Sequence, residues 1–303
     1  MTKVSATSAH PGRHHASQLL DHFEIAGPSG KHVCLVCPLL GDSIAEQTTE
    51  ARILRLPHNM VKQITRQMLE ALDFLHNECG VIHTDISPSN ILIELENPEA
   101  AVKNAPTGRT RRFSIPSPSL LSEEKLSFRL NDFGIACWVD QHLTDRIQPP
   151  QLRAPEITLE APWDASVDIY GLGCLIFQFI TGTLPFPGQA SERGSWSAEK
   201  DRIATLIHLF GPTPDVVLHN SLRAEEFAKD GVDFKRYANG RSRSLLERLV
   251  TGNMRDVGYN PKNDMSLDEV PIFCDLLRRM LATDPRKRES ARTLLKHPWL
   301  SES

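Results

Sequence analysis

An aspartate and an asparagine lie five residues apart in a short polar stretch of this chain. Asp85 and Asn90 fall between a helical pattern and the apolar run at 91–93. Phosphoryl transfer needs a base that orients the attacking hydroxyl, which Asp85 could supply. It also needs an oxygen ligand for Mg²⁺, which the side-chain carbonyl of Asn90 could supply. The spacing therefore predicts two parts of one catalytic loop.

A second carboxylate follows at Asp132, within the tetrapeptide Asn-Asp-Phe-Gly at 131–134 and after the strand-like residues 127–130. A carboxylate at such a turn could hold the metal ion that bridges the phosphates of ATP. An alternative remains for the first motif, because an aspartate followed by an asparagine can form a turn in which the carboxylate caps a backbone amide. Short motifs carry that risk when they stand alone.

Three further elements follow in order and favour the catalytic interpretation. Residues 153–156 read Arg-Ala-Pro-Glu, residues 168–173 read Asp-Ile-Tyr-Gly-Leu-Gly, and Arg288 lies in a basic stretch at 284–288. In enzymes that carry this catalytic loop and the Asp-Phe-Gly turn, a Pro-Glu pair of this kind ends the segment that follows the turn. Five elements in this order indicate more than coincidence.

Composition predicts a globular protein of a reducing compartment. The 303 residues are 40% hydrophobic, which is enough for a large core, and the net charge of −4 gives no bulk attraction to nucleic acid or an anionic membrane. The N-terminus lacks the apolar core of a signal peptide, and the longest apolar run, 169–180, is too short to span a bilayer. Six scattered cysteines fit a cytoplasmic and/or nuclear location.

Cys34 and Cys37 form a Cys-x-x-Cys pair, which suggests a metal or redox site. The pair lies in a strand-like run, where residues three apart point to opposite faces. No second such pair exists in the sequence to complete a tetrahedral metal site. We therefore expect both thiols to be buried and structural.

The elements that must position the catalytic residues follow from periodicity. Residues 19–25 and 32–36 predict a β-hairpin across a Gly-Pro-Ser-Gly turn. Residues 57–77 carry apolar side chains at helical spacing, which predicts a long amphipathic helix that ends at Gly80 and leads into the catalytic loop.

Beyond residue 164 the pattern is helical. We expect helices at 166–181, 199–210, 269–282 and 289–296, with a loop-rich region at 211–267. The C-terminal two-thirds of the chain therefore predict a helical lobe.

Residues 97–126 interrupt the regular pattern with proline, serine, threonine and basic residues. They predict a flexible insert between two strands. Arginines at 109–112 precede Ser114, an arrangement that suits phosphorylation by a basic-directed kinase. The composition alone favours a solvated linker.

With these motifs placed, the chain resembles eukaryotic protein kinases throughout, and more narrowly the serine/arginine-rich-protein kinases of the CMGC group. The narrower resemblance is carried by the strand pair and turn at 27–36, by Thr84 where most kinases have arginine, by residues 135–139, and by the insert at 97–126. The resemblance implies an α+β protein-kinase-like fold, mostly the helical C-lobe with a remnant of the β-rich N-lobe.

The resemblance also implies domain boundaries. Residues 1–41 would form a partial N-lobe, with the end of helix C, two strands and the hinge, and residues 42–303 would form the C-lobe. Nothing before His10 resembles a glycine-rich loop or a phosphate-binding strand lysine, so we expect half of the nucleotide clamp to be missing from this chain. Glu156 would pair with Arg288 to brace the C-lobe.

Catalytic roles follow from the resemblance by position. Asp85 would be the base, and Asn90 and Asp132 would be the Mg²⁺ ligands. Asp168 would anchor the catalytic loop from the central helix. Because Thr84 replaces an arginine, no basic residue lies next to Asp85 to bind an activating phosphate. Activity should therefore not depend on activation by phosphorylation.

The resemblance further implies an ATP site. Cys37 would gate the back of the pocket, Pro38 to Leu40 would form the hinge that faces adenine, and Leu92 would be the floor under the ring. The implied cofactors are ATP and Mg²⁺.

Two positions depart from the pattern of that family. Ser87 replaces a lysine that touches the transferred phosphate, and Pro149 replaces a threonine that this lysine contacts. Loss of one group that stabilises transition-state charge slows an enzyme by about 10²–10³. With the strand lysine also missing, simple addition gives roughly 10⁴–10⁶, which non-additivity could shrink. We expect little or no kinase activity from this chain alone.

The implied function is ATP-dependent transfer of phosphate to serine in Arg/Ser-rich proteins. A pseudokinase or scaffold protein without phosphotransfer is the alternative. The uncharged residues 177–183 offer an arginine-rich substrate little to pair with. Direct nucleic-acid binding is not expected, because no aromatic platform accompanies 109–112. We expect a protein substrate, no membrane partner, and leave the oligomeric state open.

Overall fold

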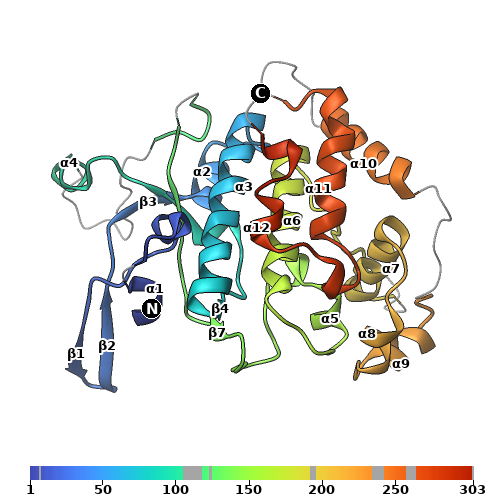
Figure 1. Ribbon diagram of the computed structural model, residues 1–303, viewed down its shortest axis with the longest axis horizontal. Coiled ribbons are helices and arrows are strands. Elements are labelled where there is room, and N and C mark those ends of the chain that lie inside the picture. Colours follow the sequence, from blue (N-terminus) through green and yellow to red (C-terminus); the bar gives the residue numbers. More distant parts are fainter. Residues whose placement is uncertain are drawn as a thin grey trace.

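The structure is a computed structural model that describes residues 1–6, 8–104, 118–122, 125–191, 196–233, 242–256 and 264–301. Helices dominate it, and the few short strands gather on one side (Figure 1). The long helices at the centre bury a continuous apolar core. The predicted α+β fold with a dominant helical lobe is therefore confirmed.

A β-hairpin projects from the strand-rich side (Figure 1). Strands β1 (Asp21–Gly27) and β2 (Gly30–Val36) pair antiparallel along their whole length, from Asp21 opposite Val36 to Gly27 opposite Gly30. Gly30 has φ of 119°, a value that glycine adopts without the strain of a side chain. The hairpin predicted from the sequence is thus confirmed.

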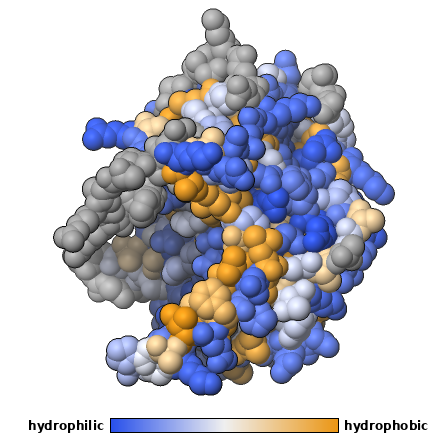
Figure 2. All heavy atoms as spheres, turned by 90° about the vertical axis from the view of Figure 1, so that its left-hand side faces the viewer, coloured by the Kyte–Doolittle hydropathy of each residue, from blue (hydrophilic) through white to orange (hydrophobic). Residues whose placement is uncertain are grey.

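The predicted burial of the two hairpin thiols is wrong. Cys34 is only partly buried and Cys37 is exposed. Both faces of the hairpin also expose large apolar side chains, among them Phe23, Val33 and Leu35. Figure 2 views this side of the molecule and shows hydrophobic side chains gathered on it. The thiols are not buried because no described element packs over the strands. Such tertiary packing is not encoded in the alternation of residues along a strand.

Two small sheets carry the loops of interest. Strands β3 (Leu40–Ser43), β5 (Ile91–Glu94) and β6 (Phe128–Leu130) form an antiparallel sheet in the order β3-β5-β6. Strand β4 (Val81–Ile82) pairs with β7 (Cys137–Trp138). The segments that contain Asp85 and Asp132 therefore each run between short paired strands.

Helix α3 (His58–Asp73) leads toward the catalytic loop as predicted. Its buried face includes Met60, Ile64 and Met68, which recur at helical spacing. A π-helical turn, Phe74–Cys79, extends the helix, and Gly80 ends it with φ of 63° in the left-handed region that suits glycine.

Helix α6 (Ser166–Thr181) matches its predicted range and packs against α3. It is buried on nearly all sides, as the apolar run predicted. In the described part of the chain, no helix is long and apolar enough to cross a membrane.

The remaining helices surround this centre. Before α6 lie α1 (Thr2–Ser5), α2 (Ile44–Glu50), α4 (Pro98–Asn104) and α5 (Pro155–Thr158). After it come α7 (Ala198–Phe210), α8 (Asp215–His219), α9 (Ala224–Lys229), α10 (Ser242–Asp256), α11 (Val270–Met280) and α12 (Ala291–Leu294).

The loop-rich prediction for 211–267 is wrong where the structure describes that region. Helices α8 and α9 are each one to two turns long, too short for a periodic pattern. Helix α10 has a regular stripe, since Leu246, Val250 and Met254 are all fully buried at a spacing of four residues. The sequence thus held a signal for α10 but not for its two predecessors.

The predicted flexible insert at 97–126 is ordered at its described ends. Helix α4 lies at its start, and Leu120 is buried near its end. The side-chain amide of Gln47 donates to the Pro118 carbonyl at 2.8 Å and its oxygen accepts from the Leu120 amide at 2.9 Å. Residues 105–117 and 123–124, which include the arginines and Ser114, lie outside the described residues.

A buried ion pair joins α5 to the chain beyond α11. Arg288 donates through Nη1 to Glu156 Oε1 at 2.5 Å and through Nη2 to Oε2 at 2.8 Å, and neither side chain is exposed. Burial opposes the charge of Arg288, but Glu156 outweighs it, so the pKa of Arg288 lies above its ordinary value. The brace that the family resemblance implied is confirmed.

Substitution of Glu156 alone should destabilise the fold strongly. Glu156→Gln removes the negative partner and leaves the Arg288 guanidinium buried without a counter-charge, a change that costs about 3–5 kcal/mol. Urea denaturation at pH 7 measures the loss. The double variant Glu156→Leu with Arg288→Met removes both charges and should recover most of it, because two apolar side chains leave nothing uncompensated. A single-variant loss below about 1 kcal/mol would contradict the assignment.

Candidate active site

His83 begins the catalytic loop and is fully buried. Its Nδ1 accepts a hydrogen bond from the Asp85 amide at 3.3 Å, so the proton lies on Nε2, which donates to the Asn131 carbonyl at 2.9 Å. The ring packs edge-on against Phe133 at 5.1 Å between centroids. Neutral His83 therefore ties the loop to the Asp-Phe-Gly turn.

Asp168 lies beneath this loop, near the start of α6. Its Oδ2 accepts from the His83 amide and its Oδ1 from the Thr84 amide, each at 2.8 Å. His76 Nε2 lies 2.9 Å from Oδ2. The anchoring role that the resemblance implied for Asp168 is confirmed by these contacts.

Thr84 holds the loop in an uncommon backbone conformation. Its φ is 70°, in the left-handed region, and its side chain is buried. The hydroxyl donates to the Ile135 carbonyl at 3.0 Å, so the loop is bonded to the residues after the Asp-Phe-Gly turn. A small hydroxyl thus makes a direct link where most kinases carry a long cation.

The amide of Asn90 is bonded to Asp85. Asn90 Nδ2 donates to the Asp85 backbone carbonyl at 2.9 Å and to Asp85 Oδ2 at 2.8 Å. Asn90 is only 8% exposed, and no described residue donates to its side-chain oxygen. Two residues chosen by their spacing are therefore in direct contact, and one oxygen of the pair remains available to a ligand.

Asp132 reaches the same place from the other loop. The Asn131 amide donates to the Asn90 carbonyl at 2.8 Å, which joins the two loops. Asp132 has φ of 63°, is exposed, and accepts from the Gly134 amide at 3.1 Å. This turn conformation presents the carboxylate to solvent rather than to the core.

Asn90 and Asp132 line a cleft of about 620 Å³, whereas Asp85 is not part of its described lining. The lining comprises ten residues from β3, α2, β5 and the two loops: Ser43, Ala45, Glu46, Thr49, Glu50, Ser89, Asn90, Leu92, Asn131 and Asp132. The structure thus brings Asn90, Asp132 and Leu92 to one cleft. None of the lining residues is a lysine or arginine, so the described walls are acidic or neutral.

The predicted hinge residues do not line this cleft. Cys37, Pro38 and Leu40 are absent from the described lining of this cleft. Pro38 borders a separate cavity of about 570 Å³ together with residues of the N-terminal segment, such as Arg13 and Leu19. Contacts of these three residues with adenine stay a prediction.

The residues present fit a magnesium ion held jointly with phosphate. Asn90 and Asp132 offer one amide oxygen and one carboxylate, and Mg²⁺ is commonly bound by one or two carboxylates together with substrate phosphates and water. The described residues contain no cluster of three or more His, Cys, Asp and Glu side chains that could hold a metal by themselves. A site of this kind therefore depends on the nucleotide.

The role of Gln148 was not predicted from the sequence. This residue has φ of 62° and is buried. Its amide donates to the Thr84 carbonyl at 3.2 Å, its Nε2 donates to the Val167 carbonyl at 2.8 Å, and its Oε1 accepts from the Ala154 amide at 2.9 Å. One glutamine therefore joins the catalytic loop, α6 and the segment before the Pro-Glu pair.

His83 predicts a specific dependence of stability on pH. Burial depresses the pKa of His83 below its ordinary value, against the opposing influence of Asp168. The unfolded chain takes up a proton as the pH falls below about 6.5 while the folded chain does not, so folding stability falls in that direction. Between pH 7.5 and 5.5 we therefore expect His83 to lower the free energy of unfolding as the pH falls.

His83→Phe keeps a ring against Phe133 and removes the titration. Its free energy of unfolding should fall less than that of the wild type over the same pH range, measured by chemical denaturation. Parallel curves for the two proteins would show that His83 does not carry the effect. The other histidines are common to both proteins and cancel in the difference.

Comparison with known proteins agrees with this geometry. Residues 14–300 match the family described as Protein kinase domain. A serine/threonine-protein kinase SRPK of Physarum polycephalum is 30% identical over 312 aligned positions, which cover 94% of this chain and 71% of the relative.

Two further relatives extend the similarity. The protein kinase dsk1 of Schizosaccharomyces pombe is 28% identical, with 97% of this chain and 70% of the relative covered. The human SRSF protein kinase 3 is 23% identical, with 96% of this chain and 76% of the relative covered. Protein kinases in general use ATP and Mg²⁺ and act on protein substrates. The chain therefore belongs to the protein kinase family, and within it to the serine/threonine kinases of the SR-protein kinase group.

Proposed function

We propose that this chain transfers phosphate from MgATP to serine side chains of Arg/Ser-rich proteins. The observation that carries the proposal is the bond from Asn90 Nδ2 to Asp85 Oδ2 at 2.8 Å, together with the shared cleft of Asn90 and Asp132. This arrangement supports the proposal, because positioned phosphoryl transfer requires a carboxylate that orients the hydroxyl and oxygen ligands for the metal close to it.

Each residue has a separate task in this proposal. Asp85 accepts a hydrogen bond from the attacking serine hydroxyl and orients its oxygen. Asn90 fixes Asp85 through its amide and offers its carbonyl oxygen to Mg²⁺, and Asp132 offers a carboxylate. The ion, when bound, neutralises charge on the phosphates. Leu92 lies under the nucleotide, with Cys37, Pro38 and Leu40 as further family-based contacts.

Two features support an arginine-rich protein as the substrate. One relative is named SRSF protein kinase 3, and another is named serine/threonine-protein kinase SRPK. Glu50 lines the same cleft as Asn90, and carboxylates pair well with the planar guanidinium of arginine. None of the six cysteines, all of which the structure describes, forms a disulfide, which is consistent with a cytoplasmic and/or nuclear location.

A scaffold without phosphotransfer is the second candidate. It is favoured by the absence of a cation from the described cleft lining, by the small side chain of Ser87 and by the missing hydroxyl at Pro149. Each missing group that stabilises transition-state charge slows transfer by about 10²–10³. We therefore expect transfer by this chain to be well below the roughly 1–100 s⁻¹ typical of kinases.

Asp85→Asn should abolish the transfer that the wild type shows. The amide cannot accept the hydroxyl proton, and loss of such a group costs about 10²–10⁴ in rate. Labelled phosphate transfer from ATP to an Arg/Ser-repeat peptide measures the effect. Asp268→Asn, the same change at an exposed residue outside the cleft, is the matched control and should keep the wild-type rate. Transfer that survives Asp85→Asn would exclude the assigned base.

Nucleotide binding separates the two candidates further. MgATP should raise the melting temperature of the wild type by several degrees at 100-fold excess over its Kd, because only the folded chain binds it. Asp132→Asn should lose most of the increment that depends on magnesium. A shift that is the same with and without magnesium in both proteins would count against the proposed ligands.

A further inference from the structure

Residues 147–153 border the place where the substrate hydroxyl must lie. The segment is bonded to the catalytic loop through the Gln148 amide and the Thr84 carbonyl, and Thr84 directly precedes Asp85. In the proposed function, the substrate peptide that presents serine to Asp85 runs along this segment. The backbone position of 147–153 sets how that serine approaches.

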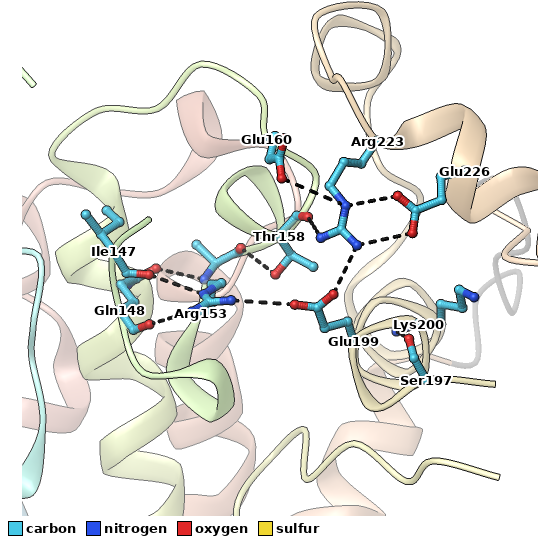
Figure 3. Close-up of polar contacts among 11 residues, drawn as sticks. Ile147, Gln148, Arg153, Thr158, Glu160, Ser197, Glu199, Lys200, Arg223 and Glu226 are labelled. Carbon is cyan, nitrogen blue, oxygen red and sulfur yellow. Dashed lines mark hydrogen bonds and ion pairs between the residues drawn. The ribbon is translucent and has the colours of Figure 1, made fainter. Parts of the chain in front are cut away.

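Arg153 folds back and holds this segment. Its Nε donates to the Ile147 carbonyl at 3.2 Å and its Nη2 donates to the Gln148 carbonyl at 3.1 Å (Figure 3). Ile147 and Gln148 are themselves buried, and no other described group donates to either carbonyl. Since an unpaired buried carbonyl costs about 1–3 kcal/mol, the conformation of the segment depends on where the guanidinium lies.

Glu199 approaches Arg153 from the opposite side. Its Oε1 lies 3.5 Å from Arg153 Nη1, and its Oε2 accepts from Arg223 Nη2 at 3.2 Å (Figure 3). Glu199 stands in the first turn of α7, whose N-cap Ser197 accepts from the Lys200 amide. One carboxylate on a capped helix is therefore shared by two arginines from different segments.

The surroundings make this carboxylate necessary for the position of Arg153. Burial is the main influence that lowers the pKa of Arg153, and three further cations, Arg146, Arg202 and Arg223, act in the same direction. Glu199 is the group that opposes them. Without it, a guanidinium with a side chain only 13% exposed would remain among like charges. It would then favour solvent over the two carbonyls.

We propose that Glu199 is a positioning residue for the substrate segment 147–153 and acts through Arg153. The carboxylate does not touch substrate. It fixes the guanidinium, the guanidinium fixes the carbonyls of Ile147 and Gln148, and these fix the wall beside Asp85. The inference rests on the proposed function only in taking this wall as the path of the peptide.

The network offers its own matched control. Arg223 also donates to Glu226 through Nε at 3.1 Å and to the Thr158 carbonyl through Nη1 at 3.0 Å. Glu226 is half exposed and, among the described residues, pairs with Arg223 rather than with Arg153. Glu226→Gln therefore removes a carboxylate from the same cluster and leaves the Glu199–Arg153 pair intact, whereas Glu199→Gln removes the pair.

Hydrogen exchange of the intact chain, without ATP or peptide, tests the proposal. In Glu199→Gln the amides of Gln148 and Ala154 should exchange about fivefold faster than in the wild type, which corresponds to about 1 kcal/mol. In Glu226→Gln they should exchange at the wild-type rate. Amides in the later turns of α7, at 203–210, should exchange at the wild-type rate in both variants, which distinguishes a local opening of the segment from a general loss of structure.

Kinetics provides the second measurement. If the wild type transfers phosphate, Glu199→Gln should raise KM for an Arg/Ser-repeat peptide about fivefold and leave KM for ATP unchanged. Glu199→Asp keeps the negative charge, so its KM for the peptide should lie between those of the wild type and Glu199→Gln. Unchanged exchange in Glu199→Gln, or equal acceleration in Glu226→Gln, would overturn the proposal. A wild type that transfers nothing would count against the proposed function alone, because the exchange result is read without catalysis.

Discussion

The buried carboxylate of Asp168 is the contact on which the catalytic loop depends. It accepts the backbone amides of His83 and Thr84 at 2.8 Å each, from a helix that is itself buried on nearly all sides. A buried charge is costly unless hydrogen bonds replace the lost water, and these two donors together with His76 do so. The two bonds also compensate the left-handed conformation of Thr84, since such strain persists only where surrounding contacts determine it.

From Thr84 the constraint spreads to the other two loops. Its hydroxyl is bonded to the Ile135 carbonyl and its own carbonyl to the Gln148 amide. The residues after the Asp-Phe-Gly turn and the segment around Gln148 are therefore both hydrogen-bonded to Thr84, the residue next to Asp85. Positions within one hydrogen-bonded frame vary less than positions on independent loops, and transfer between oxygens needs that precision.

An element or site residue of this protein could be predicted when the residues that determine it lie close together in the sequence. Helices α3 and α6 and the hairpin were predicted from periodicity, and Asp85, Asn90 and Asp132 were identified from their spacing, because each signal lies within a few turns of chain. Gln148 and the Glu199–Arg153 pair were missed, since their partners lie far apart in sequence and belong to no repeating pattern. The exposure of Cys37 was mispredicted for the same reason: burial depends on what packs against a strand, which alternation does not specify.

In this site, the residues that hold the base in place differ from the cations that would stabilise the charge of the phosphates. Only the residues that hold the base are all present in the described chain. Asp85 is held by Asn90, and the frame beneath it by Asp168, through contacts that do not involve Ser87 or a cation in the cleft. Replacing a phosphate-binding lysine by serine therefore need not disturb the geometry of the base. Because electrostatic stabilisation is usually the largest single contribution to catalysis, a chain can keep kinase geometry with a greatly reduced rate. Retained geometry is thus evidence of what the site binds and orients, while the rate depends on which cations reach the phosphates.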